Sequence, residues 1–213
     1  AMYGGEQRLW DESFAEVLLD LGVNAFGREV DLSDPAEIVA LMDRVRDRAG
    51  MLSILVNNAA FSTNGDIDEI TAAQLADHYA VNVRGMALLT QAFVRQWSGA
   101  SGGRVVNMTS GQGQGPMPGE LAYAASKGAV EAFTTSVSPT LAARGITINA
   151  VNPGPNDTGW MTDELKAILL PKFPMGRIGN PQDAARLVAF LCNEDAEWIT
   201  GQVINSEGGF WRK

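Results

Sequence analysis

The chain has 213 residues, of which 46% are hydrophobic, and its formal net charge is -9. This length and apolar content suffice for one large α/β domain with a real core. The acidic balance argues against nucleic acid as a partner, and no apolar run approaches the roughly 20 residues that span a membrane. The single cysteine, Cys192, rules out an internal disulfide. It favours a reducing compartment, for which we expect the cytoplasm.

The predicted elements alternate between helices and strands, because apolar residues at helical spacing are followed by short apolar runs of strand length. In chain order we expect a helix at 11–21, a strand at 24–32, a helix at 33–50, a strand at 53–58, a helix at 71–97, a strand at 103–110, a helix at 119–145, a strand at 146–152, a helix at 180–193 and a strand at 201–206. Such alternation predicts a parallel sheet with crossover helices.

Local signals define the ends of these elements. Asp34 is expected to cap the second helix in a capping box with Glu37, and Gly50 to end it. Pro139 lies inside the fourth predicted helix and is expected to kink or break it. The continuous apolar run at 53–58 predicts a strand that is buried on both faces.

One tyrosine stands in a position suited to acid–base chemistry. Tyr123 precedes Lys127 by four residues, so both lie on one helical face, and Ser110 ends the preceding strand. A free tyrosine has a pKa of about 10, but a nearby ammonium group favours the phenolate and lowers that pKa. The carboxyl ends of parallel strands, where Ser110 lies, are the edge at which open α/β sheets bind ligands. Small residues around Lys127 leave room for a cofactor against the helix.

With five further segments, this pattern resembles the short-chain dehydrogenase/reductase family over about residues 31–209. The segments are "DLSDP" from Asp31, "NNAA" from Asn57 to Ala60, "VNVRG" with Asn82, "NPGPNDT" from Asn152 to Thr158, and "ITGQVINSEGG" from Ile199 to Gly209. Two positions depart from the family pattern: Ala60 replaces a glycine, and Asn156 stands where an apolar residue is more frequent. The pattern is most similar to the branch of 3-oxoacyl-carrier-protein reductases and sugar-alcohol dehydrogenases.

The resemblance implies a Rossmann-type α/β fold, a doubly wound parallel sheet in three layers, in a single domain over residues 1–213. It implies an NAD(P)(H)-dependent oxidoreductase that interconverts a carbonyl and a secondary alcohol by hydride transfer. In this family Tyr123 would be the acid or base, and Ser110 would hold the substrate oxygen. Lys127 would hold the nicotinamide ribose, and Asn82 would order a water that relays protons to the lysine.

The resemblance also assigns binding residues and partners. We expect contacts to NAD or NADP, whose choice stays open, from Asp31, Leu32, Asn58, Ala59, Ala60, Tyr123, Lys127, Pro153, Gly154, Asn156 and Thr158. We expect a small carbonyl or alcohol substrate at Ser110, Gln112, Tyr123 and Trp160, with residues 152–179 as the substrate loop. Trp160 and Met161 fit the core or the pocket equally well. No metal, nucleic acid or membrane is expected, and we expect a homotetramer or homodimer.

The family's first strand, its Thr-Gly-x-x-x-Gly-x-Gly loop and the helix after it are not found in the sequence, and "YGGEQ" at 3–7 is no substitute. In the family strand order 3-2-1-4-5-6-7, the missing strands would lie between those predicted at 24–32 and 53–58. We expect this unit to belong to a longer chain; a truncated protein or a cofactor-less relative are the alternatives.

Two other functions stay open at this point. A non-catalytic or cofactor-less binding or regulatory protein would keep the fold without the glycine loop. An epimerase or dehydratase of the extended branch is disfavoured, because the chain ends too soon for a separate substrate domain. His78 is the only histidine, so a Ser-His-Asp triad is improbable, and we interpret it as an ordinary helix residue.

Overall fold

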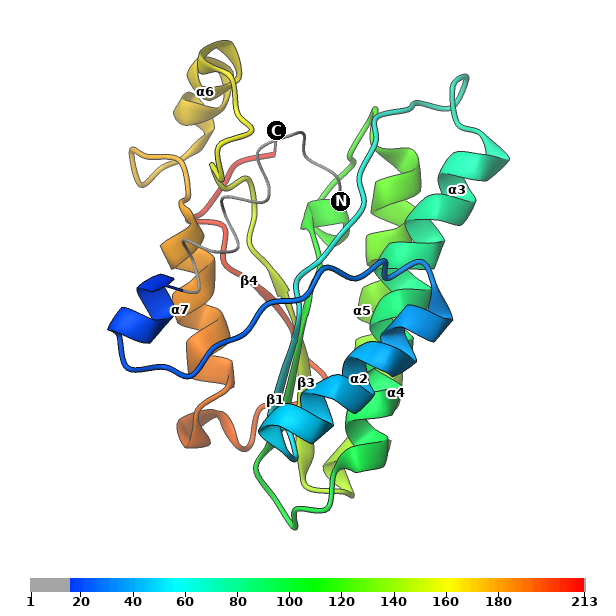
Figure 1. The fold of residues 1–213 in the computed structure, drawn as a ribbon. Helices are drawn as coiled ribbons and strands as arrows, with labels where there is room; N and C mark the ends of the chain where they lie inside the picture. The colour runs from blue at the N-terminus through cyan, green and yellow to red at the C-terminus, as the bar shows by residue number, and fades with distance from the viewer. Residues whose placement is uncertain (1–15, 213) are drawn as a thin grey trace.

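The computed structural model describes residues 16–212 as three layers, with a parallel sheet between helices (Figure 1). The strands of the described residues follow one another in the sheet in the order β1-β2-β3-β4. They are β1 (Ile54–Asn57), β2 (Gly103–Met108), β3 (Ile146–Asn152) and β4 (Val203–Asn205). On one face lie α2 (Pro35–Ala49), α4 (Met86–Gln96) and α5 (Leu121–Ala142), and on the other lies α7 (Pro181–Leu191). The predicted Rossmann-type α/β fold is confirmed.

All three strand pairs are parallel, so the carboxyl ends of the strands meet at one edge of the sheet. The register aligns Asn57 of β1 with Asn107 of β2, which in turn aligns with Ala150 of β3. Ser110 therefore follows β2 at the same edge at which Pro153 follows β3. This edge is where the sequence places the candidate site.

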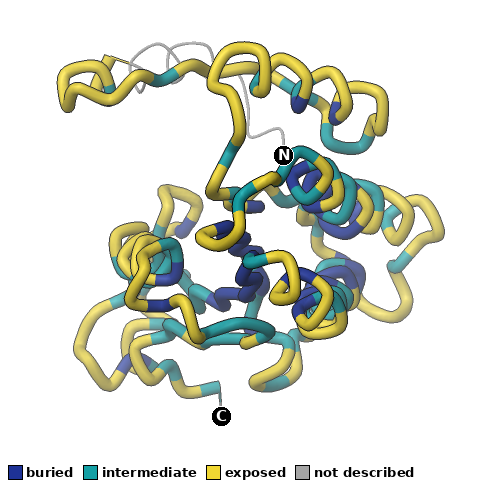
Figure 2. The backbone as a smooth tube through the Cα atoms, turned by 90° about the horizontal axis from the view of Figure 1, so that it is seen from below, coloured by how far each residue is buried: buried dark blue, intermediate teal, exposed yellow. Residues whose placement is uncertain are grey.

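Two apolar clusters hold the layers together. The first lies between the sheet and α2, α4 and α5, and its buried residues are Ile38, Met42, Leu89, Phe93, Val105, Leu141, Ile146 and Ile148. The second lies between the sheet and α7, and its buried residues are Val106, Val151, Leu191 and Ala196. Cys192 packs against this second cluster, and its partial burial raises the pKa of its thiol. Figure 2 shows the buried residues gathered at the centre of the molecule.

The strand predicted at 24–32 is wrong, and the strand at 53–58 is not buried on both faces. Residues 16–20 are helical, residues 23–31 are irregular, and the start of the helix predicted at 11–21 lies outside the described residues. No strand of the described part lies beside 23–31 to accept its backbone hydrogen bonds. In the described part of the chain β1 is an edge strand, because it pairs with β2 on one side and with no described strand on the other. Its Ile54 and Val56 are 44% and 41% exposed, on the face opposite the one where Leu55 meets the core.

Helix α2 begins as expected at Asp34, whose side chain accepts a hydrogen bond from the backbone N–H of Ala36. The predicted capping box is wrong, because Glu37 accepts from the backbone N–H of Asp31 instead of that of Asp34. The helix ends at Gly50, with a φ of 73°. Glu37 thus fixes the loop that leads into the helix rather than the first turn itself.

The helix predicted at 71–97 is divided into three parts. They are α3 (Ala72–Tyr79), the π-helical segment η1 (Ala80–Gly85) and α4. Thr71 and Gln74 form a complete capping box at its start. Gly85 lies so close to the chain that a Cβ there would approach Leu32 O to 2.6 Å. Single-turn π-bulges inside α-helices occur frequently at functional sites, and this longer one contains Asn82.

Of the kink or break expected at Pro139, the break does not occur, because Pro139 lies in the last turn of α5. Proline has no N–H to donate to the carbonyl of Thr135, and the hydroxyl of Ser138 donates to that carbonyl instead, at 2.9 Å. The neighbouring serine thus satisfies the acceptor that the proline leaves open, and the helix continues to Ala142.

The region 152–179 is less irregular than its sequence suggests. It contains α6 (Asp163–Leu169), capped by Thr162, and a 3-10 turn η3 (Leu170–Lys172). Lys166 of α6 pairs with Asp157 at 2.7 Å, which ties the helix to the loop before it. Arg177 binds both carboxylate oxygens of Asp183 in α7 and lowers the pKa of that carboxyl.

Candidate active site

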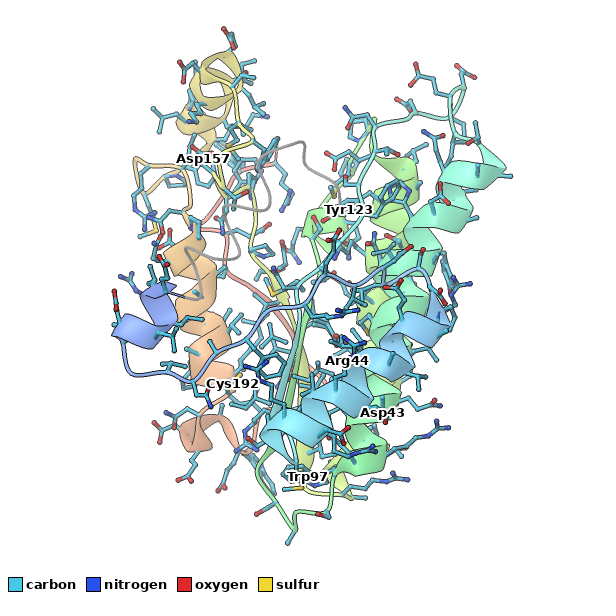
Figure 3. The ribbon with its side chains drawn as sticks, in the orientation of Figure 1. Asp43, Arg44, Trp97, Tyr123, Asp157 and Cys192 are labelled. Carbon is cyan, nitrogen blue, oxygen red and sulfur yellow. The ribbon has the colours of Figure 1, made fainter. Side chains whose placement is uncertain are left out.

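Tyr123 and Lys127 lie one turn apart near the start of α5, as the sequence predicts. The Lys127 ammonium nitrogen is 5.6 Å from the centroid of the Tyr123 ring. Figure 3 shows Tyr123 at the same end of the sheet as Asp157, with Trp97 at the opposite end. The tyrosine therefore lies at the carboxyl edge of the strands.

Lys127 is 97% buried, with a relative exposure of 3%. Its Nζ donates to Met108 O at 2.7 Å, which joins α5 to the last residue of β2. Burial lowers the pKa of this ammonium group from its ordinary value to about 8. A buried cation with one of its three hydrogens used keeps two hydrogens for a ligand or a water.

Ser110 follows β2 in an extended conformation and precedes the 3-10 turn η2 (Gly111–Gly113). Its neighbour Thr109 is buried, and the Thr109 hydroxyl lies 3.2 Å from Lys127 O and 3.0 Å from the carboxylate of Glu131. Gln112 donates to the same hydroxyl at 3.2 Å. The segment that carries Ser110 is therefore bonded to the helix that carries Tyr123 and Lys127.

Asn82 is buried at the π-helical segment, and its side chain is bonded to two other parts of the chain. Its amide donates to Phe61 O at 2.8 Å and to the Ser126 hydroxyl at 2.9 Å, and its oxygen accepts from Phe61 N at 2.7 Å. The Ser126 hydroxyl in turn donates to Tyr123 O at 2.8 Å. Both amide hydrogens of Asn82 are thus used in holding the surroundings of Tyr123.

The expected cofactor residues form two groups. Asn58 and Ala59 are exposed after β1, and Ala60 is half-buried and leads directly into the segment bound to Asn82. Asp31 is exposed, and hydrogen bonds from the side chain and the backbone of Ser33 lower the pKa of its carboxyl. The backbone of Leu32 lies against η1.

The second group follows β3. Gly154 has a φ of 66° and its N–H donates to the Asn152 side chain, while Pro153 and Asn156 are half-buried. Thr158 and Trp160 are exposed, and the Trp160 indole donates to Asn156 O at 3.1 Å. Met161 is 6% exposed and belongs to the core. Trp160, 52% exposed, is the residue of the pair that a ligand can reach.

The expected cofactor residues suit the ribose and the flat rings of a dinucleotide better than its diphosphate. The buried Lys127 cation suits the hydroxyl pair of a ribose, and the open backbone and methyl groups after β1 leave space for a flat ligand. The glycine-rich loop expected at a diphosphate does not occur in the sequence. Within residues 16–212 no group of three or more His, Cys, Asp or Glu side chains is placed to hold a metal ion.

Sequence reasoning missed the residues that connect the site. Ser126 of α5 is bonded to Asn82, and Thr109 bonds the segment of Ser110 to α5. Single hydroxyl residues of this kind carry no sequence signal. Arg212 was also missed. It pairs with Glu207, which accepts from Asn152 at 2.8 Å, and its guanidinium lies against Gly111 beside Ser110. Only the fold brings residue 212 to the end of β2.

Comparison with known proteins assigns the chain to a family. A family profile described as "Enoyl-(Acyl carrier protein) reductase" matches residues 3–211. An uncharacterized oxidoreductase of Bacillus subtilis, YjdA, is 53% identical over 205 residues, which are 95% of this chain and 82% of that protein. The chain belongs to the short-chain dehydrogenase/reductase family.

Other matches place it within that family. The 3-oxoacyl-[acyl-carrier-protein] reductase FabG of Staphylococcus aureus is 33% identical over 203 residues, covering 94% of this chain and 82% of that protein. A short-chain dehydrogenase of Burkholderia cenocepacia, solved in complex with NADP, is 30% identical with a TM-score of 0.88, over 97% of this chain and 84% of that chain. This short-chain dehydrogenase/reductase is thus an oxidoreductase near the 3-oxoacyl-carrier-protein reductase branch. In the described part, no helix is long and apolar enough to cross a membrane.

Proposed function

We propose that this protein interconverts a carbonyl and a secondary alcohol, with NADP or NAD as the hydride carrier and Tyr123 as the acid or base. The observation that carries the proposal is the buried ammonium group of Lys127, 5.6 Å from the Tyr123 ring and with a lowered pKa of about 8. Burying a cation without a paired anion costs free energy, and groups whose pKa is strongly shifted in this way are concentrated at functional sites. Here its positive field favours a phenolate at Tyr123.

The side chains divide the chemistry between them. The Tyr123 hydroxyl donates a proton to the substrate oxygen as negative charge develops on it, and takes that proton back in the reverse reaction. The Ser110 hydroxyl, held beside α5 by the bonds of Thr109, donates a hydrogen bond to the same oxygen. The nicotinamide, when bound, supplies or accepts the hydride. Because Lys127 uses one hydrogen on Met108 O, its other two are free for a ribose hydroxyl and a water.

The proton relay through Asn82 is part of the proposal in a modified form. Both side-chain amide hydrogens are used by Phe61 and Ser126, so they hold the site together. A water between Asn82 and Lys127 would then bind to a backbone carbonyl of the π-helical segment that carries Asn82.

The cofactor proposal rests on the relatives as well as on the residues. The Burkholderia structure contains NADP, and a 7α-hydroxysteroid dehydrogenase, 27% identical with a TM-score of 0.88 over 95% of this chain and 81% of that chain, contains NADH. We propose that Asp31, Asn58, Ala59 and Ala60 contact the adenosine half and that Tyr123, Lys127 and the segment 153–158 contact the nicotinamide half. A homotetramer or homodimer in the cytoplasm completes the proposal, and light scattering tests its assembly.

Tyr123→Phe tests the proposal, because it removes only the hydroxyl. We expect kcat to fall by about 10² or more, while the dissociation constant of NADPH changes little. The measurement is oxidation of NADPH at 340 nm by the full-length protein, with an acetoacetyl thioester and small ketones as substrates. Tyr79→Phe is the matched control, since Tyr79 is 55% exposed on α3. Retention of more than a tenth of the activity by Tyr123→Phe contradicts the proposal.

A further inference from the structure

His78 is a buried histidine that the proposed chemistry does not use. It lies on α3 with no exposed surface. Its Nε2 lies 3.1 Å from the backbone N–H of Thr63 and accepts from it, and its Nδ1 lies 2.7 Å from Gln74 O. A ring nitrogen that accepts a hydrogen bond carries no hydrogen, so the hydrogen is on Nδ1. This network therefore assigns the neutral Nδ1–H tautomer.

The segment that His78 binds connects β1 to α3 and carries part of the site. Residues 61–64 belong to no helix or strand. Phe61 is bonded twice to the Asn82 side chain, Thr63 is bonded to His78, and Gly65 donates to Gly119 O at 2.7 Å. His78 and Asn82 are four residues apart along one helical face. They hold the segment at two points next to the start of α5.

The imidazole ring also contacts the aromatic rings on either side of it. It meets Phe61 edge to face, with centroids 4.8 Å apart and planes at 71°. It meets Tyr123 in the same way, at 6.4 Å and 69°. Such edge-to-face pairs are a favourable arrangement of aromatic rings. The position of the Tyr123 ring therefore depends on a ring whose own orientation is set by Thr63 and Gln74.

We propose that His78 is a positioning residue: its hydrogen bond from Thr63 N–H fixes the segment 61–65, and through that segment and the ring contact it sets the places of Asn82 and Tyr123. The inference rests on the proposed roles of those two residues. His78 itself contacts neither the substrate nor the cofactor. Its effect is therefore on the geometry in which proton transfer takes place, so it acts on kcat more than on KM.

Two amide variants separate the hydrogen bond from the mere presence of a side chain. In His78→Gln the amide oxygen can reach the position of Nε2 and accept from Thr63, whereas the shorter side chain of His78→Asn reaches only the position of Nδ1. We expect His78→Asn to lower kcat by about 10- to 100-fold, with KM and the NADPH dissociation constant changed by less than about threefold. We expect His78→Gln, which keeps the hydrogen bond but loses the ring contact with Tyr123, to lower kcat less than His78→Asn does, by less than about tenfold.

Hydrogen–deuterium exchange of the peptide that covers residues 61–65 gives a readout without activity. Faster exchange in His78→Asn than in His78→Gln, together with the ordered loss of kcat, supports the proposal. Equal kcat in both variants and the wild type overturns it and leaves the role of Tyr123 intact. Failure of Tyr123→Phe to lose activity overturns the proposed function instead. If His78→Asn does not fold, His78→Gln decides: a tenfold loss of kcat with Thr63 still protected overturns the proposal.

Discussion

Two regions of the molecule differ in how their strands are supported. The packed half consists of β2, β3, α4 and α5, and every residue of β3 is buried. The outer edge consists of residues 16–31 and β1, where 16–31 are mostly exposed and no regular strand forms between residue 16 and β1. Figure 2 shows largely exposed backbone at the periphery of the molecule, away from the buried centre. A strand therefore needs a neighbouring strand, whereas the end of a helix is fixed by the residues at that end.

Two glycines with positive φ, one in each region, are expected to differ most in the free energy of unfolding that is lost on substitution. Gly145 has a φ of 69° before β3, and a Cβ there would overlap the carbonyl oxygen of Ala100 and lie 2.7 Å from the Ser101 Cα. Gly22 in the outer edge has a φ of 74°, with nothing within 4 Å of its Cβ position. We expect Gly145→Ala to lower the free energy of unfolding by about 3 kcal/mol or more, and Gly22→Ala by about 1 kcal/mol or less. Urea unfolding measures both, and equal losses would contradict the contrast.

A second test concerns the charge that the packed half buries. The pKa of Lys127 is lowered by burial from 10.5 to about 8. Between these values the unfolded chain binds more protons than the folded one, so stability rises with pH from about 8 to 10.5. Below pH 8 the buried charge costs about 3 kcal/mol, at 1.36 kcal/mol per pKa unit.

Lys127→Met removes this titration. We expect the variant to be more stable than the wild type at pH 7, by less than the full cost because the bond to Met108 O is lost, and the difference to shrink as pH rises to 10. The measurement is urea unfolding without cofactor at pH 7, 8.5 and 10. Parallel stability curves for the two proteins would show that folding does not lower the pKa of Lys127.

The third test uses two valines that are partners in the register of β1 and β2. Val106 is 1% exposed and Val56 is 41% exposed. Val106→Thr places a hydroxyl in the second apolar cluster, which we expect to cost about 1–3 kcal/mol. We expect Val56→Thr to change the free energy of unfolding by about 0.5 kcal/mol or less. Thermal unfolding of the 213-residue chain compares them, and equal losses would show that the exposed face of β1 is covered.

The same contrast explains what the sequence could predict. Caps at Asp34 and Thr71 and the approach of Tyr123 to Lys127 follow from local spacing, so they were predictable, whereas the order of the strands was expected only from the resemblance to the family. The absence of a strand at 24–32 was not predictable, because a β-strand depends on a neighbouring strand, and the sequence of one segment does not show whether that neighbour is present. In the site, the position of Lys127 beside Tyr123 was predictable from their four-residue spacing. Its bond to Met108 O was not, because that bond depends on how α5 lies against β2.

The smallest effect concerns a failure of prediction inside the packed half. Pro139 predicts a broken helix when it is considered alone, but the Ser138 hydroxyl donates to Thr135 O in place of the missing N–H. We expect Ser138→Ala to cost about 1 kcal/mol, the usual net value of one hydrogen bond. In Pro139→Ala the restored N–H can donate to the same carbonyl, so Ser138→Ala should cost less in that background. A double-mutant cycle by urea unfolding measures the difference. Additive effects of the two substitutions would mean that the serine does not compensate for the proline, and that the helix tolerates it only because it lies in the last turn.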